Sequence, residues 1–382
     1  MNYEPVIGLE IHIQLNTKSK MFCFCNNDIW KKLPNSVTCP TCLGLPGALP
    51  VPNESAIIKT QLLGLALNCS LNKNSYFARK NYFYPDLPKG YQITQYNEPF
   101  CVNGFLDTSF GKVAIRRIHL EEDTGKSMHT KEETLLDFNK SGVPLAELVT
   151  EPCIESAEQA IEFSKKIREL ARFLGVSNGD MEKGNLRLEL NISLREEGSK
   201  ELPKYRVEIK NINSFKFLKS SIDYEIKRQT ELLFSGEKII QETRGWNEKI
   251  KKTVSQRTKE KEHDYRYFPE PDIPPFEFSD SYIDKLKKDL EKIVSVKVDS
   301  VPETSLNRPK KIKEKTEYSI IDEKVLIEIV EKVIKENPGP VLEYQAGKKE
   351  VLQFLMGCVM KETKGKADPK MCLTIFQKIL LT

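Results

Sequence analysis

A strict alternation of apolar and polar side chains recurs in this chain and constrains its fold more than any other feature. Residues 6–15 read V-I-G-L-E-I-H-I-Q-L. In a β-strand this order places Ile7, Leu9, Ile11, Ile13 and Leu15 on one face and Gly8, Glu10, His12 and Gln14 on the other. Because any half-solvated strand carries polar residues on its outer face, this segment alone fits an ordinary surface strand as well as a site.

Three further segments, 113–121, 186–194 and 205–210, alternate in the same way. Their polar faces carry Arg117, His119 and Glu121; Arg187, Glu189 and Asn191; and Arg206, Glu208 and Lys210. An antiparallel sheet that lays the four faces side by side would gather carboxylates, histidines and cations on one concave wall. Crowded carboxylates repel one another unless a cation lies among them, and oxygen ligands with one imidazole suit Mg²⁺. Neighbouring Arg and Lys suit a nucleoside triphosphate, whereas the alternative is that these faces form ordinary surface ion pairs.

Size and composition indicate a globular protein of two or three domains. The chain has 382 residues, of which 39% are hydrophobic and 30% charged, and a net charge of +4 that neither requires nor excludes nucleic acid. No apolar run approaches the ~20 residues that span a bilayer, and no secretory signal opens the chain, so we expect a cytoplasmic protein without membrane association. The glycine patterns of P-loops, Rossmann folds and serine hydrolases are absent from the sequence.

Four of the nine cysteines lie within twenty residues, at Cys23, Cys25, Cys39 and Cys42. In a cytosolic protein such a cluster favours a metal over disulfides. The C-x-C and C-P-T-C pairs predict a structural zinc site with four thiolate ligands. The alternative is two reduced cysteine pairs without a ligand.

Helical spacing and capping residues predict most of the helices. We expect helices after Asn53, over 156–174 and 215–234, and a short one over 283–293. Three more are expected at the end of the chain, over 322–337, 343–362 and 368–381. Residues 79–95, which mix aromatic residues with prolines, predict a rigid loop lining a cleft. The expected fold class is therefore α+β, with a mostly antiparallel sheet flanked by helices and a small C-terminal all-α region.

Several long motifs resemble the B subunit of the bacterial aspartyl/glutamyl-tRNA amidotransferases. They cover roughly residues 3–275 and include V-I-G-L-E-I-H-I-Q-L, C-P-T-C-L-G-L-P-G-A-L-P-V, R-K-N-Y-F-Y-P-D-L-P-K-G-Y-Q-I-T-Q, R-I-H-L-E-E-D-T-G-K, G-V-P-L-A-E-L-V-T-E-P and H-D-Y-R-Y-F-P-E-P-D. The resemblance implies a cradle-like catalytic domain over 1–275, a helical or linker region over 276–318 and a helical tail domain over 319–382.

The resemblance also implies an activity and partners. Members of this family activate the side-chain carboxylate of Glu-tRNA(Gln) or Asp-tRNA(Asn) with ATP. Ammonia that the amidase subunit releases from glutamine then replaces the phosphate, and a small third subunit completes the complex. The serine nucleophile of the amidase lies on another chain, which agrees with the missing hydrolase motif.

By motif, the resemblance implies a set of site residues. The catalytic group is Glu10, His12, Glu121, Glu122, Glu189 and Glu208, with Glu10, His12, Glu122, Glu189 and Glu208 as Mg²⁺ ligands. Alternation favours Glu121 on the His119 face, whereas a local twist would present Glu122 instead. The residues expected around ATP are Arg79, Lys80, Tyr82, Tyr84, Lys89, Tyr91, Arg117, His119, Arg187 and Lys210. For those between 79 and 91 the alternative role is packing within the loop.

The chain departs from the family pattern in two places. It reads G-N-L-R-L-E-L-N over 184–191 where the family has G-S-L-R-C-D-A-N, so Glu189 carries an extra methylene. The segment after Asp272 is also much shorter than usual, although 354–369 still resembles the end of the tail domain. A rival hypothesis is therefore a tRNA-binding or assembly subunit of the same complex that has lost catalysis.

Overall fold

The computed structural model describes residues 2–258, 264–298, 323–345, 351–363 and 369–380. The chain divides into two compact units, residues 1–307 and 308–382, which are described here one at a time. The segment 276–318, expected to be a shortened helical or linker region, includes residues outside the described ranges.

In its described residues, the first unit contains the strands and four α-helices. Its strands are β1 (Tyr3–Gln14), β2 (Ser70–Leu71), β3 (Asn74–Ser75), β4 (Ala78–Asn81), β5 (Tyr91–Thr94), β6 (Cys101–Thr108), β7 (Gly111–Glu122), β8 (Lys126–His129), β9 (Thr134–Asp137), β10 (Pro144–Thr150), β11 (Leu186–Glu196), β12 (Val207–Ile212), β13 (Glu242–Asn247), β14 (Lys252–Thr258), β15 (Phe268–Pro269) and β16 (Phe276–Glu277). Its helices are α1 (Glu54–Ala66), α2 (Ala157–Phe173), α3 (Phe215–Phe234) and α4 (Asp280–Val298).

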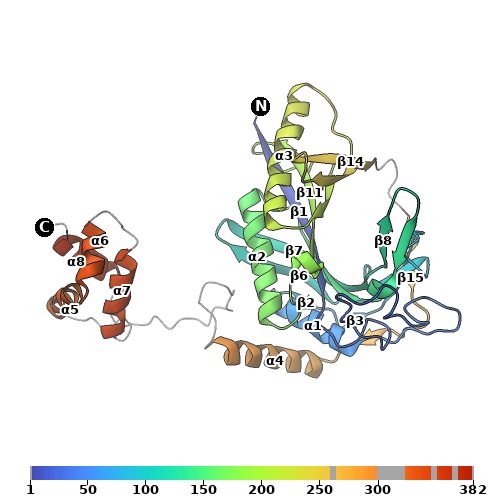
Figure 1. Ribbon diagram of the computed structural model, residues 1–382, viewed down its shortest axis with the longest axis horizontal. Coiled ribbons are helices and arrows are strands. Elements are labelled where there is room, and N and C mark those ends of the chain that lie inside the picture. Colours follow the sequence, from blue (N-terminus) through green and yellow to red (C-terminus); the bar gives the residue numbers. More distant parts are fainter. Residues whose placement is uncertain (1, 259–263, 299–322, 346–350, 364–368, 381–382) are drawn as a thin grey trace. The chain divides into compact units, whose positions relative to one another are not determined.

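One large sheet of twelve strands forms the frame of this unit (Figure 1). Its strands follow the order β14-β13-β12-β11-β1-β10-β7-β5-β4-β15, with β6 pairing with β7 and β2 with β6. Within the described strands, only the β12–β13 pair is parallel. The expected α+β fold with a mostly antiparallel sheet is therefore confirmed.

The alternation in β1 divides the sheet into an apolar and a polar face. Ile7, Leu9, Ile11, Ile13 and Leu15 are at most 1% exposed and belong to the main hydrophobic core. Helices α1, α2 and α3 cover this apolar face, to which α2 contributes Phe163 and Ile167. Because side chains alternate along a strand, the polar residues of β1 necessarily face away from these helices.

The predicted helices of the first unit are confirmed, and their caps explain their starts. Ser156 Oγ accepts a hydrogen bond from Gln159 N at the start of α2, and Ser214 Oγ accepts one from Phe217 N at the start of α3. Asn53 caps α1 through the Ala56 amide. Helix α4 is longer than the expected 283–293. No helix in the described part of the chain is long and apolar enough to cross a bilayer.

Residues 79–95 are not a loop throughout, which corrects one prediction. They form a hairpin in which β4 and β5 pair in antiparallel register, with Arg79 opposite Ile93. The two prolines that suggested a loop, Pro85 and Pro88, lie in the turn between the strands, together with Gly90 at φ 72°. Proline is excluded from paired strand positions but not from such a turn, so its presence marked the tip of the hairpin rather than an unpaired segment.

The second unit contains helices α5 (Glu323–Glu336), α6 (Pro338–Gln345), α7 (Val351–Glu362) and α8 (Pro369–Leu380). Their core includes Leu326, Val330, Leu355, Val359 and Phe376. The expected single helix over 343–362 is wrong, because α6 and α7 are separate. Pro338 takes the first position of α6, where its missing N–H costs nothing, so a residue expected only to end α5 also begins the next helix.

Candidate active site

The strand order brings the predicted polar faces together. The predicted faces belong to β1, β7, β11 and β12. In the sheet these strands follow the order β12-β11-β1-β10-β7, in which β10 lies between β1 and β7. Glu10 on β1 is directly opposite Glu189 on β11, and His12 is opposite Glu147 on β10. Glu147 is in turn opposite His119 on β7. The four alternating segments therefore form one continuous polar surface, as the sequence predicted.

Two groups of potential metal ligands lie on this surface. The first, which we call the imidazole cluster, consists of His12, Glu121 and Glu147. His12 Nε2 is 3.5 Å from Glu121 Oε1 and 3.5 Å from Glu147 Oε2, while His119 Nε2 is 3.4 Å from the same Glu147 oxygen. All three ligand atoms of the cluster lie within 4.8 Å of one another, which suits a shared cation.

The second group, the carboxylate cluster, consists of Glu10, Glu189 and Glu208, again with ligand atoms within 4.8 Å of one another. Lys210 Nζ lies 2.9 Å from Glu189 Oε2 and 3.4 Å from Glu208 Oε1. Asn191 Nδ2 donates to Glu10 Oε1 at 2.8 Å, and Thr243 Oγ1 donates to Glu208 Oε2 at 2.7 Å. These neighbours orient the carboxylates, and Lys210 balances part of their charge.

Burial and mutual repulsion shape the acid–base properties of both clusters. Burial and the neighbouring carboxylates raise the pKa of Glu10 and of Glu121. Burial would also raise the pKa of Glu147, but its contacts with His119 and His12 outweigh burial and hold that pKa well below its usual range. For His12, burial favours the neutral ring, yet Glu147 and Glu121 raise its pKa to about 9. The pocket thus favours positive charge at its centre.

Both clusters line one polar cleft of about 300 Å³. Its wall carries six carboxylates, against which stand three lysine or arginine side chains, Lys80, Arg187 and Lys210. Arg187 is already engaged, because one of its terminal guanidinium nitrogens lies 2.8 Å from Asp123 Oδ2. An excess of buried carboxylates over cations is costly unless a further cation is bound. The donor set, oxygens with one imidazole, fits a hard divalent ion.

Not all residues expected around ATP reach the cleft. Lys80, Tyr82, Arg187 and Lys210 line it. His119 is buried behind Glu147. The others point elsewhere: Arg79 pairs with Glu270 at 2.7 Å and stacks on Tyr91, Arg117 stacks on Tyr96, Tyr84 is 57% exposed, and Lys89 and Tyr91 line a separate cavity.

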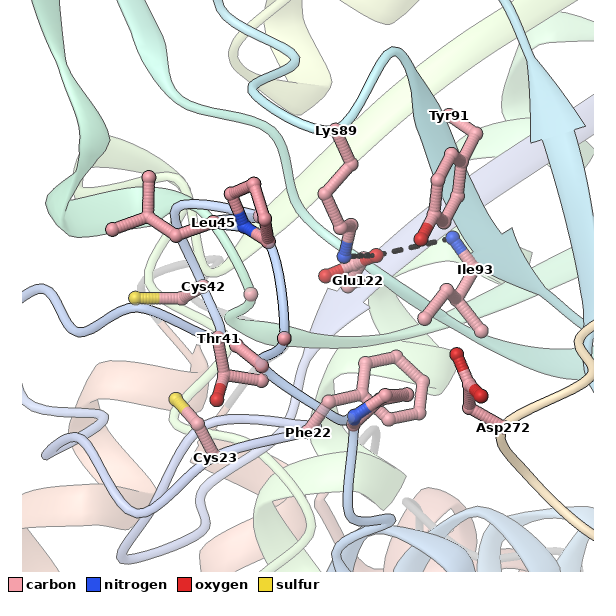
Figure 2. Close-up of a pocket in the computed structure, with 16 residues that line it drawn as sticks. Phe22, Cys23, Thr41, Cys42, Leu45, Lys89, Tyr91, Ile93, Glu122 and Asp272 are labelled. Carbon is pink, nitrogen blue, oxygen red and sulfur yellow. Dashed lines mark hydrogen bonds and ion pairs between the residues drawn. The ribbon is translucent and has the colours of Figure 1, made fainter.

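Glu122 is the main correction to the expected ligand set. The alternation of β7 continues to its end, so Glu121, not Glu122, shares the face of His119 and joins the imidazole cluster. The Glu122 carboxylate instead pairs with Lys89 and accepts a hydrogen bond from Ile93 N at 3.1 Å. Figure 2 shows this pair at the edge of a second cavity of about 210 Å³, which the Cys23 and Cys42 side chains also line.

The four clustered cysteines converge as expected. The sulfurs of Cys23, Cys25, Cys39 and Cys42 all lie within 4.8 Å of one another. Four sulfurs at the corners of a tetrahedron around zinc would be about 3.8 Å apart, so the donor set fits such an ion. Cys39 N donates to Cys42 Sγ at 3.1 Å, and the fully buried Lys20 places its Nζ 3.6 Å from the same sulfur. The hydrogen bond from Cys23, with these two neighbours, lowers the pKa of Cys42 to about 5.

Sequence reasoning missed Glu147, which contacts both histidines of the polar face. Strand β10 is buried along its whole length, so it shows no alternation. The signal that was available is chemical: Glu147 is the only charged residue in P-L-A-E-L-V-T. A lone carboxylate in an otherwise uncharged buried strand requires a specific partner.

Comparison with known proteins covers the whole chain. Residues 5–284 match the family described as the GatB/GatE catalytic domain, and residues 288–380 match the GatB domain. A relative from Thermotoga maritima, named as the B subunit of aspartyl/glutamyl-tRNA(Asn/Gln) amidotransferase, is 41% identical over 482 aligned positions that cover 100% of this chain and 99% of the relative. Proteins of the same name from Thermosipho melanesiensis and Persephonella marina are 39% and 38% identical, and both alignments cover 100% of each chain.

The alignment with the Thermotoga maritima protein has 482 positions, whereas this chain has 382 residues, so at least 100 positions have no counterpart here. The shortening expected from the sequence therefore agrees with the lengths. Despite it, both family domains are matched. The chain belongs to the family of aspartyl/glutamyl-tRNA(Asn/Gln) amidotransferase B subunits.

Proposed function

We propose that this chain is the kinase and transamidase subunit of a glutamine-dependent tRNA amidotransferase. The observation that carries the proposal is the cleft, in which two clusters of cation ligands lie on adjoining strands of one sheet. We assign the chemistry to residues 1–275, a shortened linking region to 276–318, and a helical tail to 319–382. The substrates would be Glu-tRNA(Gln), Asp-tRNA(Asn) or both, together with ATP.

The cleft residues suit a phosphoryl transfer. The imidazole and carboxylate clusters would hold Mg²⁺, which when bound supplies charge that neutralises the phosphates of ATP. Lys80 and Lys210 place further positive charge at the wall of the same cleft. His119, held against Glu147, fixes the orientation of that carboxylate. These residues bind and orient groups that would otherwise repel one another.

The proposed reaction has two steps. An oxygen of the side-chain carboxylate attached to tRNA attacks the γ-phosphorus of ATP, and the bond to the departing ADP breaks. Ammonia then attacks the activated carbonyl carbon, phosphate leaves, and the nitrogen loses a proton to give the amide. The amidase subunit would supply ammonia from glutamine, and the small third subunit would complete the complex. This division agrees with the absence of a hydrolase motif here.

We also propose that the four clustered cysteines bind a structural zinc ion. The cysteine loop carries no group of the cleft, so its metal would hold residues 23–42 in place rather than take part in the reaction. Replacing Cys39 by Ser should lower the zinc content, measured by elemental analysis of the purified complex, from one ion per chain towards zero. An unchanged zinc content would contradict this assignment.

The rival function is a tRNA-binding or assembly subunit without catalysis, and the missing hundred positions favour it. The two groups of potential cation ligands in the cleft favour the enzyme. A single experiment separates the two. The chain is purified in complex with its amidase and small partner subunits, and Glu-tRNA-dependent ATP hydrolysis and amidation are measured.

We expect activity in the wild type and its loss in Glu10→Gln. The matched control is Glu132→Gln, an exposed glutamate in the β8–β9 turn. An inactive wild-type complex that still binds tRNA would establish the rival function. Equal activity in Glu10→Gln and the wild type would remove the carboxylate cluster from the mechanism.

A further inference from the structure

Five tyrosines form an unbroken series of ring contacts that passes along the cleft and reaches the surface at both ends. In order of contact, this tyrosine array consists of Tyr84, Tyr82, Tyr265, Tyr267 and Tyr96. Tyr82 and Tyr265 line the cleft, whereas Tyr84 and Tyr96 at the two ends are 57% and 46% exposed. The array is thus a rim that joins the candidate active site to the protein surface.

Backbone pairing holds the two halves of the array together. The segment that carries Tyr265 and Tyr267 runs alongside β4, where Asn81 N donates to the Tyr265 carbonyl at 3.0 Å. Asn81 Nδ2 also donates to the Arg266 carbonyl at 2.9 Å. Tyr267 stacks flat on Tyr96, with ring centres 4.8 Å apart and planes 10° from parallel. The rings are therefore positioned before any ligand arrives.

The array combines neutral rings with cations. Lys80 Nζ lies 4.9 Å from the centre of the Tyr265 ring, and the Arg117 guanidinium lies 4.5 Å from that of Tyr96. Burial raises the pKa of Tyr82 and raises that of Tyr267 to about 12, so both rings are uncharged at neutral pH. Aromatic faces interleaved with Lys and Arg are the surface on which proteins stack the bases of single-stranded nucleic acid.

The proposed reaction places such a strand here. The carboxylate to be activated is joined through an ester to the last ribose of tRNA, and an extended glutamyl group spans only about 6 Å. The last nucleotide must therefore lie at the rim of the cleft when the carboxylate is inside it. The centres of consecutive rings in the array are 4.8 to 6.1 Å apart. Five rings at this spacing extend over more than one base, whereas the adenine of ATP would need only one stacking position.

We propose, resting on the proposed function, that the tyrosine array stacks the unpaired 3′-terminal nucleotides of the tRNA substrate. Its test is a binding cycle on the purified three-subunit complex. One probe is deacylated tRNA(Gln), and the other is the same RNA without its unpaired 3′ nucleotides. Tyr84→Leu and Tyr96→Leu change exposed ends of the array, and Phe110→Leu, an exposed aromatic residue of the β6–β7 turn, is the matched control.

Shortening the RNA should weaken binding to the wild type and to Phe110→Leu by about tenfold, because one or more stacked bases are lost. In the double variant Tyr84→Leu/Tyr96→Leu the same shortening should cost less than about threefold, and each single variant should fall between. In separate amidation assays the variants should also show a raised KM for Glu-tRNA(Gln), with the KM for ATP unchanged.

An equal penalty for shortening in the wild type and the variants would overturn the proposal, as would a wild type that does not distinguish the two RNAs. A rise in the KM for ATP alone would overturn it in favour of adenine binding. Because the cycle uses deacylated RNA and no ATP, it can fail while the wild-type complex still amidates Glu-tRNA. An inactive wild-type complex would instead refute the proposed function.

Discussion

The first unit contains two groups of buried and half-buried carboxylates, and they differ in how their charge is balanced. Glu225 on α3 is fully buried but accepts hydrogen bonds from Arg228, Gln229 and Thr253, and Arg244 lies 3.3 Å away. Burial would raise its pKa, yet Arg228, Gln229 and Thr253 together outweigh burial and lower it. In the cleft, burial and neighbouring carboxylates instead raise the pKa of Glu10 and Glu121.

The difference separates structure from function. A buried acid with protein partners on every side is a completed ion pair that holds elements together. Buried acids that outnumber their cations are costly to the folded chain, and they persist where a ligand supplies the missing charge. This contrast supports the proposed cation binding in the cleft, whereas the Glu225 network stabilises the fold.

The largest expected effect concerns the completed network. Glu225→Ala removes the carboxylate that accepts from Arg228, and it leaves Arg244 only its contacts with Glu242 and Thr253. The change should lower the free energy of unfolding of the sheet unit by about 3–5 kcal/mol. Urea unfolding of the purified chain measures this change. A loss below about 1 kcal/mol would show that the network contributes no more than a surface pair.

Glu147→Gln should have the next largest effect, and on activity rather than stability. The amide cannot match the charge of His12 and loses the carboxylate that contacts His119. Amidation should therefore fall by about a hundredfold, at the upper end of what losing a metal-site contact costs. Steady-state amidation by the three-subunit complex measures it. The control is Glu132→Gln, and a Glu147→Gln enzyme as active as this control would exclude the imidazole cluster from the reaction.

Unlike Glu225→Ala, Glu10→Gln should not lower the free energy of unfolding of the metal-free protein. Glu10 lies directly opposite Glu189, and like charges at paired positions destabilise a sheet by up to about 1 kcal/mol. Without Mg²⁺, the variant should therefore be as stable as the wild type or slightly more stable in urea. Added Mg²⁺ should stabilise the wild type and not the variant. A strongly destabilised variant in the absence of metal would contradict this.

The pH dependence of stability gives the smallest and sharpest contrast. The pKa of Glu225 is lowered below its ordinary value of 4.5, so its ionised form stabilises the fold above that pH. This contribution should be lost as the pH falls through the lowered pKa. The difference in unfolding free energy between wild type and Glu225→Gln should thus be constant near pH 7 and shrink below about 4.5. A difference that grows towards acid pH would refute it.

The sequence predicted the parts of the site that follow from local periodicity. Alternation in β1, β7, β11 and β12 placed Glu10, His12, Glu121 and Glu189 on one surface, because each strand is covered by helices on one face only. Glu147 escaped because β10 is buried on both faces, so only its chemistry marked it. Long-range pairing was also invisible: nothing near Tyr96 in the sequence indicates Tyr267, and the two rings meet only through the fold.

Turns and breaks accounted for the remaining differences. The prolines at 85 and 88 suggested a loop, but they lie in the turn of a hairpin. A proline restricts the backbone at its own position and does not prevent the neighbouring residues from pairing as strands. Pro338 likewise ended one helix and began another. In both places the proline correctly marked a break. The lengths of the strands and helices beside it depended on tertiary contacts that the local sequence does not show.

The most direct test of the account is divalent-cation binding in the cleft, measured by electron paramagnetic resonance of Mn²⁺ added to the complex without ATP or tRNA. We predict that the wild type and Glu132→Gln bind Mn²⁺, whereas Glu147→Gln and Glu10→Gln bind it at least about tenfold more weakly. Equal Mn²⁺ binding in all four proteins, or none in the wild type, would contradict the claim that the unbalanced carboxylates form a cation site.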